Sequence, residues 1–175
     1  EPNSKRYSND LNYFHDSEAR VASAYEQDRA LLSDAGFEVE VEMSQPGYVR
    51  AVVSKKKVST KLEWAYDSAW RFLPPVKHAD CGYVLHPLDL AINKVLTLAG
   101  REEPRDLIDV LEVHQNILPL PALVWAAPGK DPGFNPSSLL SMLKRRGKYR
   151  AEDFTRLMLE APIDPQTLKE TLATI

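Results

Sequence analysis

The chain has 175 residues, of which 43% are hydrophobic and 27% charged, which is typical of a globular protein with one domain, or a main domain and a small helical appendage. Its net charge of −3 excludes an overall basic field, so any contact with a nucleic acid has to come from a local patch. The single cysteine, Cys81, cannot form an internal disulfide, and no apolar run approaches the roughly 20 residues of a membrane span, so we expect a cytoplasmic protein without membrane contact.

The first predicted element is a strand over residues 5–14. Alternation along an extended backbone puts Ser8, Asp10 and Asn12 on one face and apolar side chains on the other. On a strand, this spacing lets two oxygen ligands reach one hard cation such as Mg²⁺. The same pattern is more commonly the solvated face of a strand, so taken alone it leaves both interpretations open.

A helix and a hairpin are predicted next. Asp16 or Ser17 can cap a helix that Gly36 ends. Residues 37–43 then alternate apolar with acidic side chains, and after a Pro-Gly turn residues 48–54 alternate again, which predicts two paired strands. The apolar stripe expected on the helix consists of Val21, Ala24, Tyr25, Leu31 and Leu32.

A third strand, predicted over residues 58–67, carries further acidic side chains. Glu63 and Asp67 share a face with Lys61, opposite an apolar face. If this strand lies beside the first one, the oxygens of both form a three-ligand site that suits one or two Mg²⁺ ions holding a nucleoside triphosphate. If it does not, the two acids form a solvated sheet face paired with Lys61.

The second half of the chain is predicted to be mainly helical. Two prolines and a glycine in residues 68–83 indicate a loop, and the prolines of residues 117–135 indicate a connector. Capping residues, first-turn prolines and apolar periodicity predict helices at about 87–99, 104–114, 136–145, 151–160 and 165–173.

Two of these helices carry candidate binding residues. In the first, Asp89 and Asn93 share a face and Lys94 lies beside them, where a lysine could neutralise a triphosphate. A surface lysine on an amphipathic helix is the commoner case. In the second, Asp106 and Asp109 share a face near the N-terminus, where the helix dipole favours acids with or without a function.

A basic cluster lies near the end of the chain. Its members are Lys144, Arg145, Arg146, Lys148 and Arg150. It is the candidate patch for contact with an acidic polymer such as RNA. Most clusters of this kind are only solvated helix ends.

Four segments, in this order, resemble the AbiEii/AbiGii toxin family of nucleotidyltransferases. They are Arg6-Tyr7-Ser8-Asn9-Asp10-Leu11-Asn12, Lys61-Leu62-Glu63-Trp64, residues 89–101 and Arg105-Asp106-Leu107-Ile108-Asp109. The resemblance implies a DNA polymerase β-like nucleotidyltransferase core over residues 1–115, of class α+β with a mixed sheet flanked by helices. A C-terminal helical region over residues 116–175 is expected to follow.

The resemblance also implies an activity, partners and site residues. The protein would transfer a nucleotide from an NTP to an acceptor such as RNA, as one member of a bacterial toxin–antitoxin or phage-defence pair with a cognate antitoxin. The implied catalytic residues are Asp10, Asn12 and Glu63, which with Asp67 are also the implied ligands of two Mg²⁺ ions. The implied nucleotide-binding residues are Ser8, Lys94, Asp106 and Asp109.

Two departures from the family pattern leave a second hypothesis open. Asn12 stands where the family has an aspartate, and a neutral amide adds no charge to hold a second Mg²⁺. The Gly-Gly or Gly-Ser turn that normally precedes the first strand does not occur, and the sequence starts at Glu1 without an initiator Met. Either residues precede Glu1, or the site is degenerate and the fold serves as a binding module. An unrelated α+β domain is the third alternative.

Overall fold

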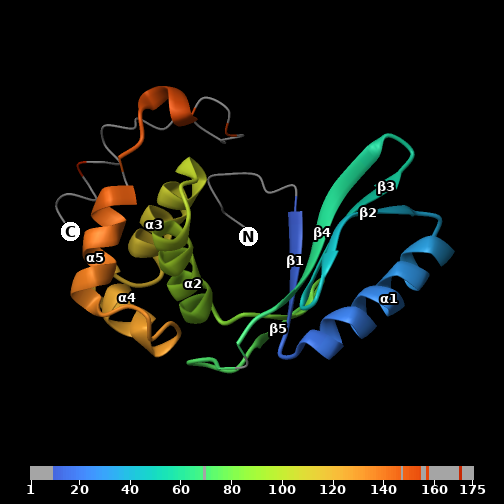
Figure 1. Cartoon of the computed structure of the whole chain (residues 1–175), viewed down its shortest axis with the longest axis horizontal. Coiled ribbons are helices and arrows are strands. Elements are labelled where there is room, and N and C mark those ends of the chain that lie inside the picture. Colours follow the sequence, from blue (N-terminus) through green and yellow to red (C-terminus); the bar gives the residue numbers. More distant parts are fainter. Residues whose placement is uncertain (1–9, 69, 147, 155–156, 158–169, 171–175) are drawn as a thin grey trace. The chain divides into compact units, whose positions relative to one another are not determined.

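The computed structural model describes residues 10–68, 70–146, 148–154, 157 and 170. They form two compact units: the described residues up to Trp70, which we call the sheet unit, and those from Arg71 on, which we call the helical unit (Figure 1). Each unit has its own hydrophobic core. The predicted α+β class with a mixed sheet is confirmed, whereas the boundary expected between residues 115 and 116 lies inside the helical unit.

The sheet unit is a four-stranded sheet with one helix against one of its faces (Figure 1). Its elements are β1 (Asp10–His15), α1 (Glu18–Asp34), β2 (Glu38–Gln45), β3 (Tyr48–Lys55) and β4 (Val58–Tyr66). The strand order is β1-β4-β3-β2, with β1 parallel to β4 and the other neighbours antiparallel. The predicted hairpin is therefore confirmed. Whether the third strand lies beside the first was left open by the sequence, and the structure shows that it does.

Local sequence explains how these elements begin and end. Of the two predicted caps, Ser17 is the one used, because its hydroxyl accepts a hydrogen bond from the backbone N–H of Arg20 at 3.3 Å. Gly36 follows α1 with φ of +79°, a left-handed conformation that glycine adopts without a Cβ clash. Gly47 takes the same region, at +73°, in the turn between β2 and β3.

The core of the sheet unit lies between the sheet and α1. The buried side chains of alternating positions in β3 and β4 and of one position in α1 form it: Val49, Ala51, Val53, Leu62, Trp64 and Val21. The prediction that Leu31 is buried was wrong, since 67% of its side chain is exposed. It lies at the margin of the helical stripe, away from the line through Val21, Tyr25 and Leu32 that meets the sheet.

In the residues that the structure describes, the helical unit contains four α-helices and a two-stranded hairpin. Its elements are β5 (Val76–His78), β6 (Gly82–Val84), α2 (Pro87–Gly100), α3 (Pro104–Asn116), α4 (Leu120–Ala126), α5 (Pro136–Arg146) and the 3₁₀ turns Ala127–Gly129 and Ala151–Phe154. Buried leucines, isoleucines and valines of α2 to α5 form its core. The predicted helices that correspond to α2, α3 and α5 are confirmed.

Two predictions for this half of the chain were wrong. Residues 68–83 are not all loop, because Gly82 at φ of +74° lets β5 pair with β6. Residues 117–135 are not only a connector, because Pro121 lies in the first turn of α4, where its missing N–H is tolerated. Most of the last two predicted helices falls outside the described residues. Among the described helices none alone has the length and hydropathy of a membrane span; α3 and residues 120–129 meet that test only as a pair bent by 105°.

Candidate functional site

The sheet face opposite α1 carries the side chains predicted to bind a metal. In the parallel pairing of β1 with β4, Asp10 lies opposite Lys61 and Asn12 lies opposite Glu63. Residues that are opposite each other in adjacent strands project to the same face of a sheet. The structure therefore brings Asp10, Asn12 and Glu63 to one face, while Ser8 lies outside the described residues.

Arg50 extends this row onto a third strand. It lies opposite Glu63 in β3, and its Nε donates a hydrogen bond of 2.7 Å to Oε1 of Glu63. The guanidinium carbon is also 5.6 Å from the centre of the Tyr48 ring. Burial raises the pKa of Tyr48, and the neighbouring Glu63 carboxylate raises it further. The hydrogen bond with Glu63 also raises the pKa of Arg50. The row across the three strands therefore contains one amide, Asn12, and one ion pair, formed by Glu63 and Arg50.

These residues fit a magnesium ion only in part. Asn12 adds an oxygen without a charge, and Arg50 already neutralises Glu63. In the part of the chain that the structure describes, no three His, Cys, Asp or Glu residues are grouped so that they could hold a metal. Proteins commonly bind Mg²⁺ through one or two carboxylates together with substrate phosphates. The face therefore suits an ion that arrives with a triphosphate better than one held by protein ligands alone.

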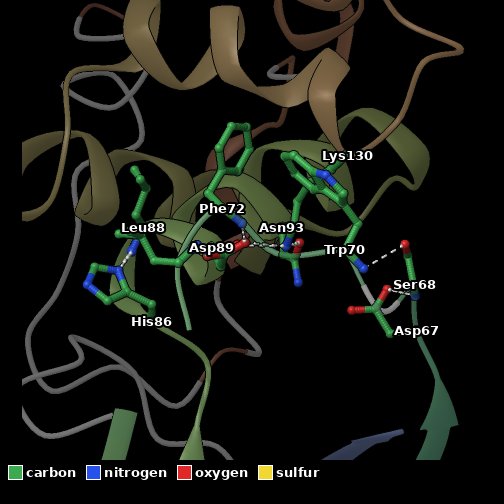
Figure 2. Close-up of polar contacts among 10 residues, drawn as sticks. Asp67, Ser68, Trp70, Phe72, His86, Leu88, Asp89, Asn93 and Lys130 are labelled. Carbon is green, nitrogen blue, oxygen red and sulfur yellow. Dashed lines mark hydrogen bonds and ion pairs between the residues drawn. The ribbon is translucent and has the colours of Figure 1, made fainter. Parts of the chain in front are cut away.

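Asp67 lies beyond the end of this row. Its backbone N–H donates to the carbonyl of His15 at 2.9 Å, and its Oδ1 accepts from the backbone N–H of Ser68 at 2.8 Å (Figure 2). Asp67 is four positions after Glu63, a span of about 13 Å in extended chain. Of these two acids, Glu63 is the one that the register places beside Asn12.

The nucleotide-binding candidates of the helical unit all take part in ion pairs. Lys94 in α2 donates a hydrogen bond of 2.7 Å to Oδ2 of Asp109 in α3. Asp106 accepts two hydrogen bonds from Arg101, at 2.7 and 2.9 Å, which raise the pKa of that arginine. Both aspartates are buried, and each forms an ion pair with a cation.

Asp89 is at the centre of a buried polar cluster in the helical unit (Figure 2). Its carboxylate accepts hydrogen bonds of 3.0 Å from the backbone N–H groups of Phe72 and Leu73 and lies 3.2 Å from Nζ of Lys130. Lys130 also donates to Oδ1 of Asn93 at 2.6 Å. Burial alone would raise the pKa of Asp89, but these donors outweigh burial and lower it. Sequence reasoning missed Lys130, which lies within the segment expected to be a connector.

Comparisons with known proteins support the fold and leave the chemistry open. No protein-family model matches the sequence, and no curated protein sequence matches it either. Among solved structures, the crystal structure of JHP933 from Helicobacter pylori is similar, with a TM-score of 0.58 and 17% sequence identity over 97% of this chain and 74% of that chain. At this identity the likeness shows a shared fold alone.

Proposed function

We propose that the protein is a magnesium-dependent nucleotidyltransferase of the toxin–antitoxin or phage-defence type. It would transfer a nucleotide from an NTP to an acceptor hydroxyl, with RNA as the expected acceptor and a cognate antitoxin as the partner. One observation supports this most: the parallel register of β1 and β4, which places Asp10, Asn12 and Glu63 on one sheet face. The ordered resemblance of four sequence segments to the AbiEii/AbiGii family adds to it.

Each residue of the sheet face has a proposed role. Asp10 and the amide oxygen of Asn12 would hold the metal of the magnesium nucleotide, and Asp10 would accept the proton of the attacking hydroxyl at its carboxylate. Glu63, on the neighbouring strand, keeps the role of third metal ligand that the resemblance implies. Mg²⁺, when bound, would neutralise part of the negative charge of the phosphates. In the helical unit, Lys94, Asp106 and Asp109 keep the nucleotide-binding roles that the resemblance implies.

Label transfer tests the proposal. Purified protein is incubated with each α-³²P-labelled NTP, Mg²⁺ or Mn²⁺ and total RNA, and labelled RNA is resolved on a denaturing gel. Wild type is expected to label RNA with at least one NTP, and Asp10→Ala is expected to abolish labelling because it removes a charged ligand and the proton acceptor. Glu26→Gln, on the exposed surface of α1, is the control and should label as wild type does. Folded wild-type protein that labels nothing would contradict the proposal.

A second candidate function is a nucleotidyltransferase fold that serves as a binding module. The Arg50–Glu63 ion pair favours it, because this pair and the neutral Asn12 reduce the negative charge available for metal ions. Asn12→Asp distinguishes the two functions in the same assay. If wild type is inactive and Asn12→Asp labels RNA, the site is degenerate. Activity of wild type that Asp10→Ala removes would exclude the module.

A further inference from the structure

An arginine lies on the face where the metal ligands were expected. Arg50 is opposite Glu63, which is in turn opposite Asn12, so three strands present a cation, an anion and an amide in one row. The side chain of Arg50 is 35% exposed and that of Glu63 21%, so a ligand that reaches this face can also reach the pair. The metal site that the family implies does not require an arginine at this place.

The guanidinium is held in a fixed position. Glu63 bonds its Nε at 2.7 Å, and the ring of Tyr48 lies 5.6 Å from its central carbon. A guanidinium has five N–H donors, so one bonded to Glu63 still has donors for another acceptor. Its planar fork matches the geometry of phosphate oxygens, and less conformational freedom is lost when the arginine is already positioned.

We propose that Arg50 binds the phosphates of the nucleotide and that Glu63 positions it for that contact. This inference rests on the proposed function and adds the residue that recognises the triphosphate. The neutral Asn12 agrees with it, since a site with fewer negative charges accepts a phosphate chain at lower electrostatic cost. The alternative is a cross-strand ion pair that only supports the sheet, and a pair this exposed contributes little to stability.

Titration calorimetry with inorganic triphosphate in EDTA tests Arg50 without any metal or base. Wild type is expected to bind, and Arg50→Gln to bind on the order of tenfold more weakly, because it removes charge-assisted hydrogen bonds. Arg50→Lys should fall between them, since it keeps a point charge but loses the fork. Arg20→Gln, in an exposed ion pair on α1, is the matched control and should bind as wild type does.

Glu63→Gln separates phosphate recognition from a merely structural pair. It removes the negative charge beside the phosphate site but keeps an amide oxygen that can accept the hydrogen bond from Arg50, so Arg50 stays positioned and the affinity for metal-free triphosphate is expected to rise by about two- to tenfold. A structural pair predicts instead that both partners' variants lower affinity together through a looser sheet. If circular dichroism shows that Arg50→Gln does not fold, the affinities of Arg50→Lys and Glu63→Gln for triphosphate are compared with that of wild type instead.

The outcomes distinguish this inference from the proposed function. If wild type binds an NTP and labels RNA while Arg50→Gln binds triphosphate unchanged, the role of Arg50 is overturned and the enzyme remains. If wild type binds neither triphosphate nor any of the four NTPs, both are overturned. Weaker binding by Arg50→Gln together with tighter binding by Glu63→Gln supports the inference.

Discussion

At the scale of single residues, Asp89 is the most buried charged residue among those that the structure describes. It is 0% exposed, and its ion-pair partner Lys130 is 7% exposed. Its carboxylate accepts hydrogen bonds from two backbone N–H groups and forms an ion pair with the lysine. These two hydrogen bonds hold Phe72 and Leu73 against the start of α2. Removing one member of a buried pair leaves the other without compensation, which typically costs about 3–5 kcal/mol.

The lowered pKa of Asp89 predicts how stability depends on pH. Its pKa in the folded protein lies below the ordinary value of 3.8, so its contribution is fully present above about pH 4 and is lost as pH falls through the folded pKa. Asp89→Asn should lower the free energy of unfolding at pH 7 by about 3–5 kcal/mol and lose less stability than wild type below pH 4. Urea unfolding at a series of pH values measures both effects.

The control for this prediction is Asp34→Asn, at the exposed end of α1. It should leave the free energy of unfolding close to that of wild type, both at pH 7 and below pH 4. An Asp89→Asn curve that runs parallel to the wild-type curve below pH 4 would show that Asp89 does not contribute in this way.

The sequence predicted site residues where their pattern lies within one element. Alternation along a strand was enough to put Asp10 and Asn12 on one face, and the register then added Glu63. Arg50 and Lys130 were missed because their partners come from other elements, and no spacing within a strand or helix reveals a neighbour 13 or 41 residues away. The charges that complete both clusters are therefore known only from the structure.

At the scale of elements, caps and breakers decided which predictions held. The helices that begin at a cap or a first-turn proline and end at glycine were predicted, as in α1 and α2. The failures were α4 and the pairing of β5 with β6. In both cases residues treated as breakers are tolerated, Pro121 in a first helical turn and Gly82 at the start of β6. Local composition does not show whether a proline or glycine ends an element or is tolerated within it.

Alanine substitutions at two turn glycines of the sheet unit allow the cost of a strained backbone to be distinguished from the cost of a crowded Cβ. A Cβ on Gly47 would lie 3.1 Å from Cγ of Glu18 and 3.3 Å from Cβ of Tyr66, whereas one on Gly36 would meet only the end of Lys55 at 3.8 Å. Both residues have positive φ, so each alanine variant should lose about 1–2 kcal/mol. Gly47→Ala should lose more, because the Cβ of Tyr66 cannot move away freely.

Urea unfolding measures this difference through the fluorescence of the buried Trp64. Gly36→Ala is the matched control, since it lies in the same unit and carries the φ penalty with ordinary contacts. Equal losses for the two variants would mean that the turn relaxes and that crowding at Gly47 has no effect.

At the scale of the whole molecule, the chain forms two cores that share no residue. The sequence did not reveal this division, because periodicity shows which face of an element is buried but not which elements pack together. Helices α2 and α3 share their core with α4 and α5, so they belong with the C-terminal region rather than with the sheet.

Matched substitutions in the two cores test whether each is a cooperative unit. Leu62→Ala in the sheet unit and Leu98→Ala in the helical unit each remove a buried leucine side chain, which typically costs about 2–5 kcal/mol. Hydrogen exchange followed by mass spectrometry should show faster exchange in β2 to β4 for Leu62→Ala and in α2 to α5 for Leu98→Ala, because each cavity weakens its own core. Leu31→Ala, at an exposed position of α1, is the control and should change neither. If either core variant accelerates exchange equally in both units, the chain unfolds as one cooperative structure.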